Sequence, residues 1–143
     1  MEKVKKAKEV KITTKNGVGV LSGLASLMAD NGVNIESVCA YTNGDMATFS
    51  FLTANNQKVK DLLKGKDLRI EERDVVVLVL WNRPGVLAEV ASKFSQKGLD
   101  LEYVYGTSLP NSEMTTIVFS SKDNEKASAV FDEIVIEESG KSF

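Results

Sequence analysis

Two short turns, each followed by a helical pattern, carry the residues of this chain best suited to bind a ligand. They are Asn16-Gly17-Val18-Gly19-Val20-Leu21 and Asn82-Arg83-Pro84-Gly85-Val86-Leu87. In each turn an asparagine and a glycine precede the apolar residues that open a predicted helix. Because the first N–H groups of a helix have no partner within it, each turn presents hydrogen-bond donors and a positive dipole end to whatever lies above it. Such a helix end suits a carboxylate.

The composition offers little support for other chemistry. The chain contains no histidine and one cysteine, so the usual general base and the commonest metal ligand are missing. Cys39 is interpreted as a small core residue rather than a nucleophile, because no histidine can activate its thiol. The glutamate pairs at 71–72 and 137–138 are interpreted as solvated strand ends, with metal binding as the weaker alternative. We therefore expect no catalytic residue, no metal site and no cofactor, and a protein that is not an enzyme.

Charge and hydropathy exclude further classes of partner. A net charge of −2 and a pI of about 5.3 lack the basic surface of a nucleic-acid-binding protein. No apolar run approaches the roughly eighteen residues of a membrane-spanning helix. The charged start of the chain has no apolar segment behind it, which argues against a secretory signal. One cysteine cannot form an intrachain disulfide, and we expect a cytoplasmic protein.

The two turns belong to an internal repeat with an offset of 66 residues (85 − 19 = 66). Residues 16–38 and 82–104 share nine identities in twenty-three positions, where chance gives roughly one or two. The identical pairs are Asn16/Asn82, Gly19/Gly85, Val20/Val86, Leu21/Leu87, Ala25/Ala91, Ser26/Ser92, Gly32/Gly98, Glu36/Glu102 and Val38/Val104. A period of this length indicates two copies of one supersecondary unit.

The pattern of apolar residues and turn signals predicts the same six elements in each copy. The first copy has strands over 9–14, 33–42, 45–53 and 67–73, and helices over 20–31 and 58–64. The second has strands over 75–81, 99–109, 114–120 and 134–137, and helices over 85–97 and 124–132. Residues 1–7 are expected to be frayed. We predict an α+β protein of two ferredoxin-like βαββαβ units, over 1–73 and 74–143, each with helices on one face of an antiparallel sheet.

These motifs resemble tandem ACT domains. The run Asn82-Arg83-Pro84-Gly85-Val86-Leu87 is similar to the effector loop in the regulatory domain of 3-phosphoglycerate dehydrogenase. The run Gly32-Val33-Asn34-Ile35-Glu36 is similar to the start of the second strand there and in aspartate kinases. The resemblance implies a non-catalytic regulatory or sensor protein that binds a small amino acid. The histidine of the dehydrogenase pattern, two residues before the loop asparagine, is replaced here by Leu80 and Thr14.

An amino acid brings a carboxylate and an ammonium group, and the two turns offer partners for both. Backbone N–H groups at the helix start suit the carboxylate, and the side-chain oxygen of Asn16 or Asn82 can accept from the ammonium. By resemblance, Asn34 and Asp100 complete a neighbouring site when second strands pair edge to edge, Asn34 with Asn82 and Asp100 with Asn16. The predicted ligand-binding residues are Asn16, Gly17, Val18, Gly19, Val20, Leu21, Asn34, Asn82, Arg83, Pro84, Gly85, Val86, Leu87 and Asp100.

Structural explanations stand beside these functional ones. The glycines serve any tight turn, the two asparagines can cap helices, and Asn34 and Asp100 can be ordinary polar residues at strand starts. The favoured function is amino-acid binding by a regulatory or sensor protein. The alternative is a regulatory small subunit of an amino-acid biosynthetic enzyme, acting by protein contact with degenerate ligand sites. Exposed second-strand edges also predict a homodimer.

Overall fold

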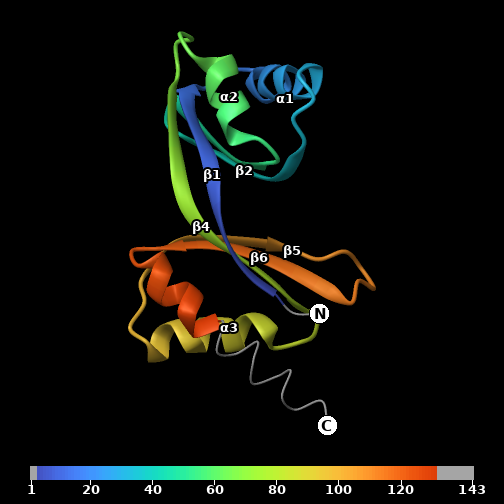
Figure 1. The fold of residues 1–143 in the computed structure, drawn as a ribbon, viewed down its shortest axis with the longest axis vertical. Helices are drawn as coiled ribbons and strands as arrows, with labels where there is room; N and C mark the ends of the chain where they lie inside the picture. Colours follow the sequence, from blue (N-terminus) through green and yellow to red (C-terminus); the bar gives the residue numbers. More distant parts are fainter. Residues whose placement is uncertain (1–2, 132–143) are drawn as a thin grey trace. The chain divides into compact units, whose positions relative to one another are not determined.

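The computed structural model describes residues 3–131 (Figure 1). Its elements are β1 (Lys3–Lys15), α1 (Val20–Asp30), β2 (Ile35–Asn43), β3 (Met46–Thr53), α2 (Asn56–Leu63), β4 (Arg69–Trp81), α3 (Val86–Gln96), β5 (Leu101–Thr107) and β6 (Met114–Ser121). Residues 124–131 are also helical. The chain divides into two compact units. We call Lys8–Arg73 the N-terminal unit, and the residues from Asp74 onward with those before Lys8 the C-terminal unit.

In the N-terminal unit the strands are ordered β2-β3-β1-β4. The antiparallel register sets Val10 opposite Phe51, and successive side chains alternate between the two sheet faces. One face is buried under both α1 and α2, which lie on the same side of the sheet (Figure 1). The core consists of Val10, Ile12, Leu24, Met28, Val33, Ala47, Phe49, Phe51, Val59 and Leu63.

Local signals explain how the elements of the N-terminal unit begin and end. Asn55 caps α2, because its side chain accepts a hydrogen bond from the Lys58 N–H at 3.1 Å. Gly44 has a φ of 63°, the conformation that a tight hairpin turn between β2 and β3 needs. Gly32 follows α1 with a φ of 70° and ends it.

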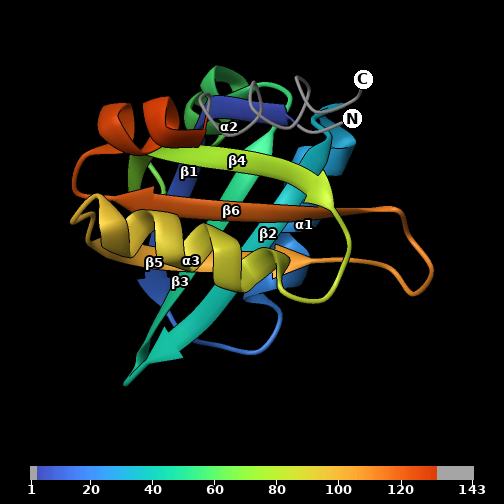
Figure 2. The same ribbon diagram turned by 90° about the horizontal axis from the view of Figure 1, so that it is seen from below.

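The C-terminal unit repeats this arrangement with the strand order β1-β4-β6-β5. Its core consists of Val76, Leu78, Leu80, Val90, Phe94, Ile117, Phe119, Ala127 and Phe131. Three rings from α3, β6 and the helix over 124–131 pack together, with centroids 4.5 Å apart for Phe94 and Phe119 and 5.1 Å for Phe94 and Phe131. Figure 2 shows α3 running alongside β5 and β6. The predicted α+β fold, with helices on one face of each sheet, is confirmed in the described residues.

The prediction that residues 1–7 fray is wrong for residues 3–7, since β1 begins at Lys3, and residues 1 and 2 lie outside the described residues. Val4 packs against the core of the C-terminal unit, and the Lys6 ammonium lies 3.0 Å from a Glu125 carboxylate oxygen. In the N-terminal unit β4 lies beside β1. The first residues of β1 and the part of β4 from Asp74 onward both belong to the C-terminal unit, and β1 is the neighbour of β4 in the sheet. The strand predicted over 134–137 lies outside the described residues.

A second difference concerns the boundary between the repeats. The sequence predicts separate strands over 67–73 and 75–81, whereas the structure has one continuous strand, β4, from Arg69 to Trp81. Asp74 therefore joins the copies without interrupting the β conformation. The division into domains over 1–73 and 74–143 stays a prediction.

Candidate functional site

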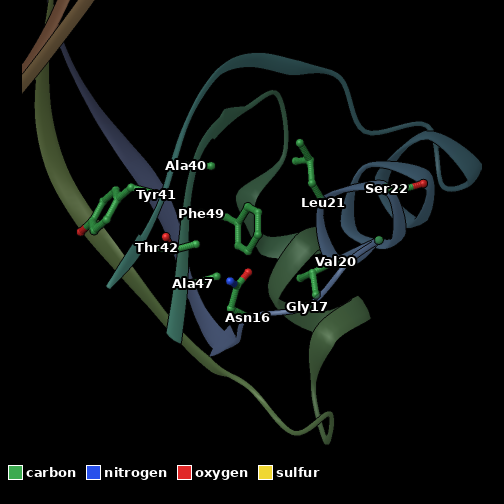
Figure 3. Close-up of a pocket in the computed structure, with 11 residues that line it drawn as sticks. Asn16, Gly17, Val20, Leu21, Ser22, Ala40, Tyr41, Thr42, Ala47 and Phe49 are labelled. Atoms are coloured by element: carbon green, nitrogen blue, oxygen red, sulfur yellow. The ribbon is translucent and has the colours of Figure 1, made fainter. Parts of the chain in front are cut away.

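A pocket of about 370 Å³ lies between the start of α1 and the strands β2 and β3 of the N-terminal unit (Figure 3). We call it the first pocket. It is lined by Asn16, Gly17, Gly19, Val20, Leu21, Ser22, Ala40, Tyr41, Thr42, Ala47 and Phe49. No charged side chain is among these lining residues.

The helix end at this pocket is open. Gly19 is the N-cap of α1, with a φ of 88°, and no side chain of the described residues makes a capping hydrogen bond. The interpretation that Asn16 only caps the helix is therefore wrong. The Val20 N–H donates to the Gly17 carbonyl at 3.5 Å, so the N–H groups of Leu21 and Ser22 are the first-turn donors left for an acceptor that enters the pocket. The helix dipole favours an anionic acceptor by about 0.3–1 kcal/mol.

Asn16 connects this turn to the hairpin between β2 and β3. Its backbone N–H donates to the Asp45 carbonyl at 2.7 Å, which fixes the turn beside the hairpin. Its side chain lines the pocket, and Figure 3 shows the amide pointing toward Phe49. The structure gives this amide no hydrogen bond to any described residue. Asn16 therefore presents both a donor and an acceptor to the pocket.

The sheet supplies the other wall. Ala40 pairs with Phe49 and Thr42 with Ala47, so these four side chains share the face that carries α1. Ala47 and Phe49 are buried, and they form an apolar floor. Tyr41 falls on the opposite face, and Figure 3 shows its ring pointing away from α1. Tyr41 therefore lines the pocket with atoms other than those of its ring.

The C-terminal unit has an equivalent pocket of about 400 Å³, the second pocket. It is lined by Val86, Leu87, Val104, Tyr105, Gly106, Thr107, Ser108, Thr115 and Ile117. The repeat offset of 66 relates Val86, Leu87 and Gly106 to Val20, Leu21 and Ala40 of the first pocket. The second pocket therefore lies at the same place in its unit, between the start of α3 and the strands β5 and β6.

The turn before α3 is held differently. The Asn82 N–H donates to the Glu113 carbonyl at 2.8 Å, as Asn16 does to Asp45. The Asn82 side chain, however, donates to the Ser112 carbonyl at 2.9 Å and does not line the second pocket. Gly85 is the N-cap of α3, with a φ of 93° and no side-chain cap among the described residues.

A charged pair stands at the start of α3. The Arg83 guanidinium donates to both carboxylate oxygens of Glu89, at 2.8 and 2.5 Å. This hydrogen bonding lowers the pKa of Glu89 from its ordinary value of 4.5. Glu89 lies in the first turn of α3, whereas the first turn of α1 has no acidic residue.

The comparisons with known proteins bear on this repeated geometry. The sequence model of the ACT domain pair family matches residues 5–139. The chain belongs to the ACT domain pair family. This confirms the predicted resemblance to tandem ACT domains and supports a regulatory, ligand-binding role. The comparison with curated proteins gave no match.

Solved structures share the fold of this ACT domain pair. A protein from Bacteroides thetaiotaomicron is 26% identical with a TM-score of 0.82, covering 90% of this chain and 88% of its own. The regulatory subunit of aspartate kinase from Thermus thermophilus is 14% identical with a TM-score of 0.66, covering 92% of this chain and 95% of its own. Aspartate kinase from Clostridium acetobutylicum is 16% identical with a TM-score of 0.56, covering 90% of this chain and 32% of its own.

The predicted site residues of the ACT domain pair divide into two groups. Those that line a pocket are Asn16, Gly17, Gly19, Val20, Leu21, Val86 and Leu87. Those that line neither of the two are Val18, Asn34, Asn82, Arg83, Pro84, Gly85 and Asp100. Val18 is fully exposed, and Asp100 lies 3.0 Å from the Lys122 ammonium. Asn34 and Asp100 directly precede β2 and β5, whereas the pockets contact the later residues of those strands. Their pairing with Asn82 and Asn16 stays a prediction.

Sequence reasoning missed the sheet side of both pockets. In the first pocket the missed residues are Ser22, Ala40, Tyr41, Thr42, Ala47 and Phe49; in the second they are Val104, Tyr105, Gly106, Thr107, Ser108, Thr115 and Ile117. The sequence signal that could have identified these residues is the alternation of side chains along a strand, which has a period of two residues. Placing Phe49 on the buried face also places its cross-strand neighbour Ala40 on the side of α1.

The remaining candidate groups lie apart from the pockets. Cys39 is half-buried and lines neither of the two pockets described, and burial, with the nearby Glu9 carboxylate, raises the pKa of its thiol. Within residues 3–131 no three His, Cys, Asp or Glu side chains are placed to hold a metal ion. In the same range no helix combines the length and apolarity needed to cross a membrane.

Proposed function

We propose that this ACT domain pair is a non-catalytic regulatory protein that binds a small amino acid, or a related small carboxylate, beside the first helix of a unit. The observation that carries the proposal is the repetition of one pocket, at equivalent positions, in both units. Two copies that keep a cavity beside an uncapped helix end favour a binding role over a purely structural turn.

The first pocket offers a partner for each part of an amino acid. The carboxylate would accept from the first-turn N–H groups of α1, where no described side chain competes for them. The ammonium would donate to the side-chain oxygen of Asn16. The α-carbon substituent would face the apolar floor of Ala47 and Phe49. A volume of about 370 Å³ is near the lower end of small-molecule sites, roughly 300–1,000 Å³.

A thermal-shift panel of the twenty amino acids tests this proposal. An amino acid present at about a hundredfold excess over its Kd stabilises the folded state by about 2.7 kcal/mol. For a chain of this length that energy raises Tm by several degrees. Each amino acid is compared with its decarboxylated amine, which keeps the ammonium but cannot use the helix N–H groups.

The expected result is a shift with at least one amino acid and none with its amine. A panel in which no amino acid moves Tm contradicts the proposal. An amine that shifts Tm as much as its amino acid contradicts the assignment of the carboxylate to the helix end.

The sheet edges support a proposal about partners. In the described residues β2 and β5 each have one neighbouring strand, so each leaves one side of its backbone unpaired. On the helix side of these edges Val38 and Val104 remain 49% and 47% exposed. Exposed valines along an unpaired strand favour association with a further strand, and a second copy of this chain is the proposed occupant.

The extent of one structural match supports a second candidate function. The match covers 95% of the chain of the Thermus thermophilus protein, which is named as the regulatory subunit of aspartate kinase. This ACT domain pair would then act as the regulatory small subunit of an amino-acid biosynthetic enzyme. Purification of a tagged chain from its own cells would recover a catalytic polypeptide in equal amount if that is its function, and the chain alone if it is not.

A further inference from the structure

We infer that the two pockets are not equivalent: one amino acid with an uncharged side chain binds per chain, in the first pocket, and the second pocket stays empty. The inference rests on the proposed function and names its site, its stoichiometry and the class of ligand.

The asparagine of each turn gives the first reason. Asn16 lines the first pocket, and its amide has no hydrogen-bond partner among the described residues. Its counterpart Asn82 is turned to the Ser112 carbonyl at 2.9 Å and lies outside the lining of the second pocket. A ligand ammonium therefore finds a side-chain acceptor in the first pocket and no equivalent amide in the second.

The hairpins explain why the two asparagines differ. β3 begins at Met46 and β6 at Met114, an offset of 68 rather than 66, so the second hairpin is two residues longer (68 − 66 = 2). Those extra residues lie in the turn that contains Asn111, the one non-glycine residue of the described chain with a positive φ, at 62°. Ser112 and Gly44 occupy equivalent places, each one residue before the carbonyl that accepts from the asparagine N–H. Gly44 has a φ of 63° whereas Ser112 has no positive φ, so the two turns differ in backbone conformation where Asn82 finds its acceptor.

The helix starts differ in charge as well. Glu89 lies in the first turn of α3 and keeps its negative charge, because Arg83 holds both of its carboxylate oxygens. The position equivalent to Glu89 in α1 is Gly23 (89 − 66 = 23). At α3 the positive end of the helix already has a carboxylate near it, and the Arg83 guanidinium is bonded to that carboxylate and is not left for a ligand, whereas the first turn of α1 has no acidic residue.

In the second pocket, a lining hydroxyl group already donates its hydrogen bond to another residue of the protein. Thr115 stands where Ala47 stands in the first pocket, and its hydroxyl donates to the Thr107 carbonyl at 3.2 Å. The Thr115 hydroxyl therefore has no donor proton left for a ligand. The first pocket keeps the smaller Ala47 and is lined by no charged side chain. It therefore favours an amino acid whose side chain is small and uncharged, since no lining side chain offers a charged partner.

Isothermal titration with matched variants tests the inference. The probes are glycine, L-alanine, L-serine, L-threonine and L-valine, with L-aspartate and L-lysine as charged comparisons. We expect at least one uncharged probe to bind with one molecule per chain, and the charged probes to bind at least about tenfold more weakly. Asn16→Ala removes a hydrogen bond to a charged group and should weaken binding about tenfold to hundredfold. Asn82→Ala should change the Kd less than about twofold.

A second pair of variants keeps the test valid if loss of an asparagine loosens its turn. Thr42 and Ser108 are exposed, equivalent residues of the two pockets, so a tryptophan at either position fills its pocket without entering the core. Thr42→Trp should abolish binding and Ser108→Trp should not. Circular dichroism melting confirms that each variant folds.

The outcomes separate this inference from the proposed function. Two molecules bound per chain, or equal losses from the matched variants, would overturn the single-site assignment while leaving amino-acid binding intact. Tighter binding of L-aspartate or L-lysine than of every uncharged probe would overturn the ligand class. No heat or thermal shift with any amino acid would overturn the proposed function, and the inference with it.

Discussion

Gly19 is the N-cap of α1, and its backbone conformation predicts how a substitution there changes stability. Its φ of 88° is strained for any side chain, although an added methyl group would contact no atom within 4 Å. Gly19→Ala should therefore lower the free energy of unfolding by about 1 kcal/mol through the backbone alone.

Gly23 provides the matched control, because it lies within α1, is exposed, and also has open space around it. Gly23→Ala should raise the free energy of unfolding by about 0.5–1 kcal/mol, since alanine is the better helix former. Urea denaturation of both variants measures the difference. Equal effects of the two substitutions would contradict the role given to the conformation of Gly19.

Cys39 is predicted to be a slow nucleophile. Burial and the Glu9 carboxylate raise the pKa of its thiol, so at any pH below that value less of it is the reactive thiolate. At about pH 8 its reaction with a disulfide reagent should be several-fold slower in the folded protein than in urea, and the rate should still be rising above about pH 9. A folded protein that reacts as fast as free cysteine would contradict this environment.

At this scale the sequence predicted the pocket residues only in part. Asn16 and Gly19 were found because an asparagine and a glycine before a helix have a recognisable role. Asn82 has the same sequence context, but its amide donates to the Ser112 carbonyl in the turn of the second hairpin. That choice depends on a contact thirty residues away, which a local pattern does not contain.

Among the elements, β1 differs most from the prediction, because it begins at Lys3. Its first residues belong to the C-terminal unit, where Val4 packs on the core. Val4→Asp should therefore destabilise the C-terminal unit by about 1–3 kcal/mol, because it places a charge against apolar side chains. Hydrogen exchange should show lost protection in β6 and little change in β3.

Lys6→Ala is the control within the same strand. It removes the ion pair with Glu125, whose partners are 57% and 82% exposed, so it should change stability by less than about 0.5 kcal/mol. Equal loss of protection in β3 and β6 for Val4→Asp would show that the segment does not belong to one unit.

The repeat made most elements predictable, and tertiary pairing decided the rest. The helix stripes and the Gly44 turn are local signals, and α1, α3 and the β2–β3 hairpin were predicted from them. Lys3 to Ala7 carries three lysines and lacks a strand pattern, so its β conformation comes from its place beside β4. The continuity of β4 through Asp74 was missed for the same reason.

For the whole molecule, the sheet edges predict the oligomeric state. A homodimer formed through an edge strand should have twice the chain mass of 15.6 kDa in light scattering at micromolar concentration. Val38→Lys, or Val104→Lys, places a charge on an exposed edge position and should shift the protein toward the monomer without loss of helix content. A chain that is monomeric before mutation would contradict the proposed partner.

The central claim is that a small amino acid binds at the open end of α1, and the amide signals of that helix report it most directly. In a ¹H–¹⁵N correlation spectrum recorded with the amino acid that shifts Tm, the amides of Leu21 and Ser22 should move as it is added, with the Asn16 side-chain amide. The equivalent amides of Leu87 and Ala88 should stay in place. Movement confined to residues away from the start of α1 would contradict the account.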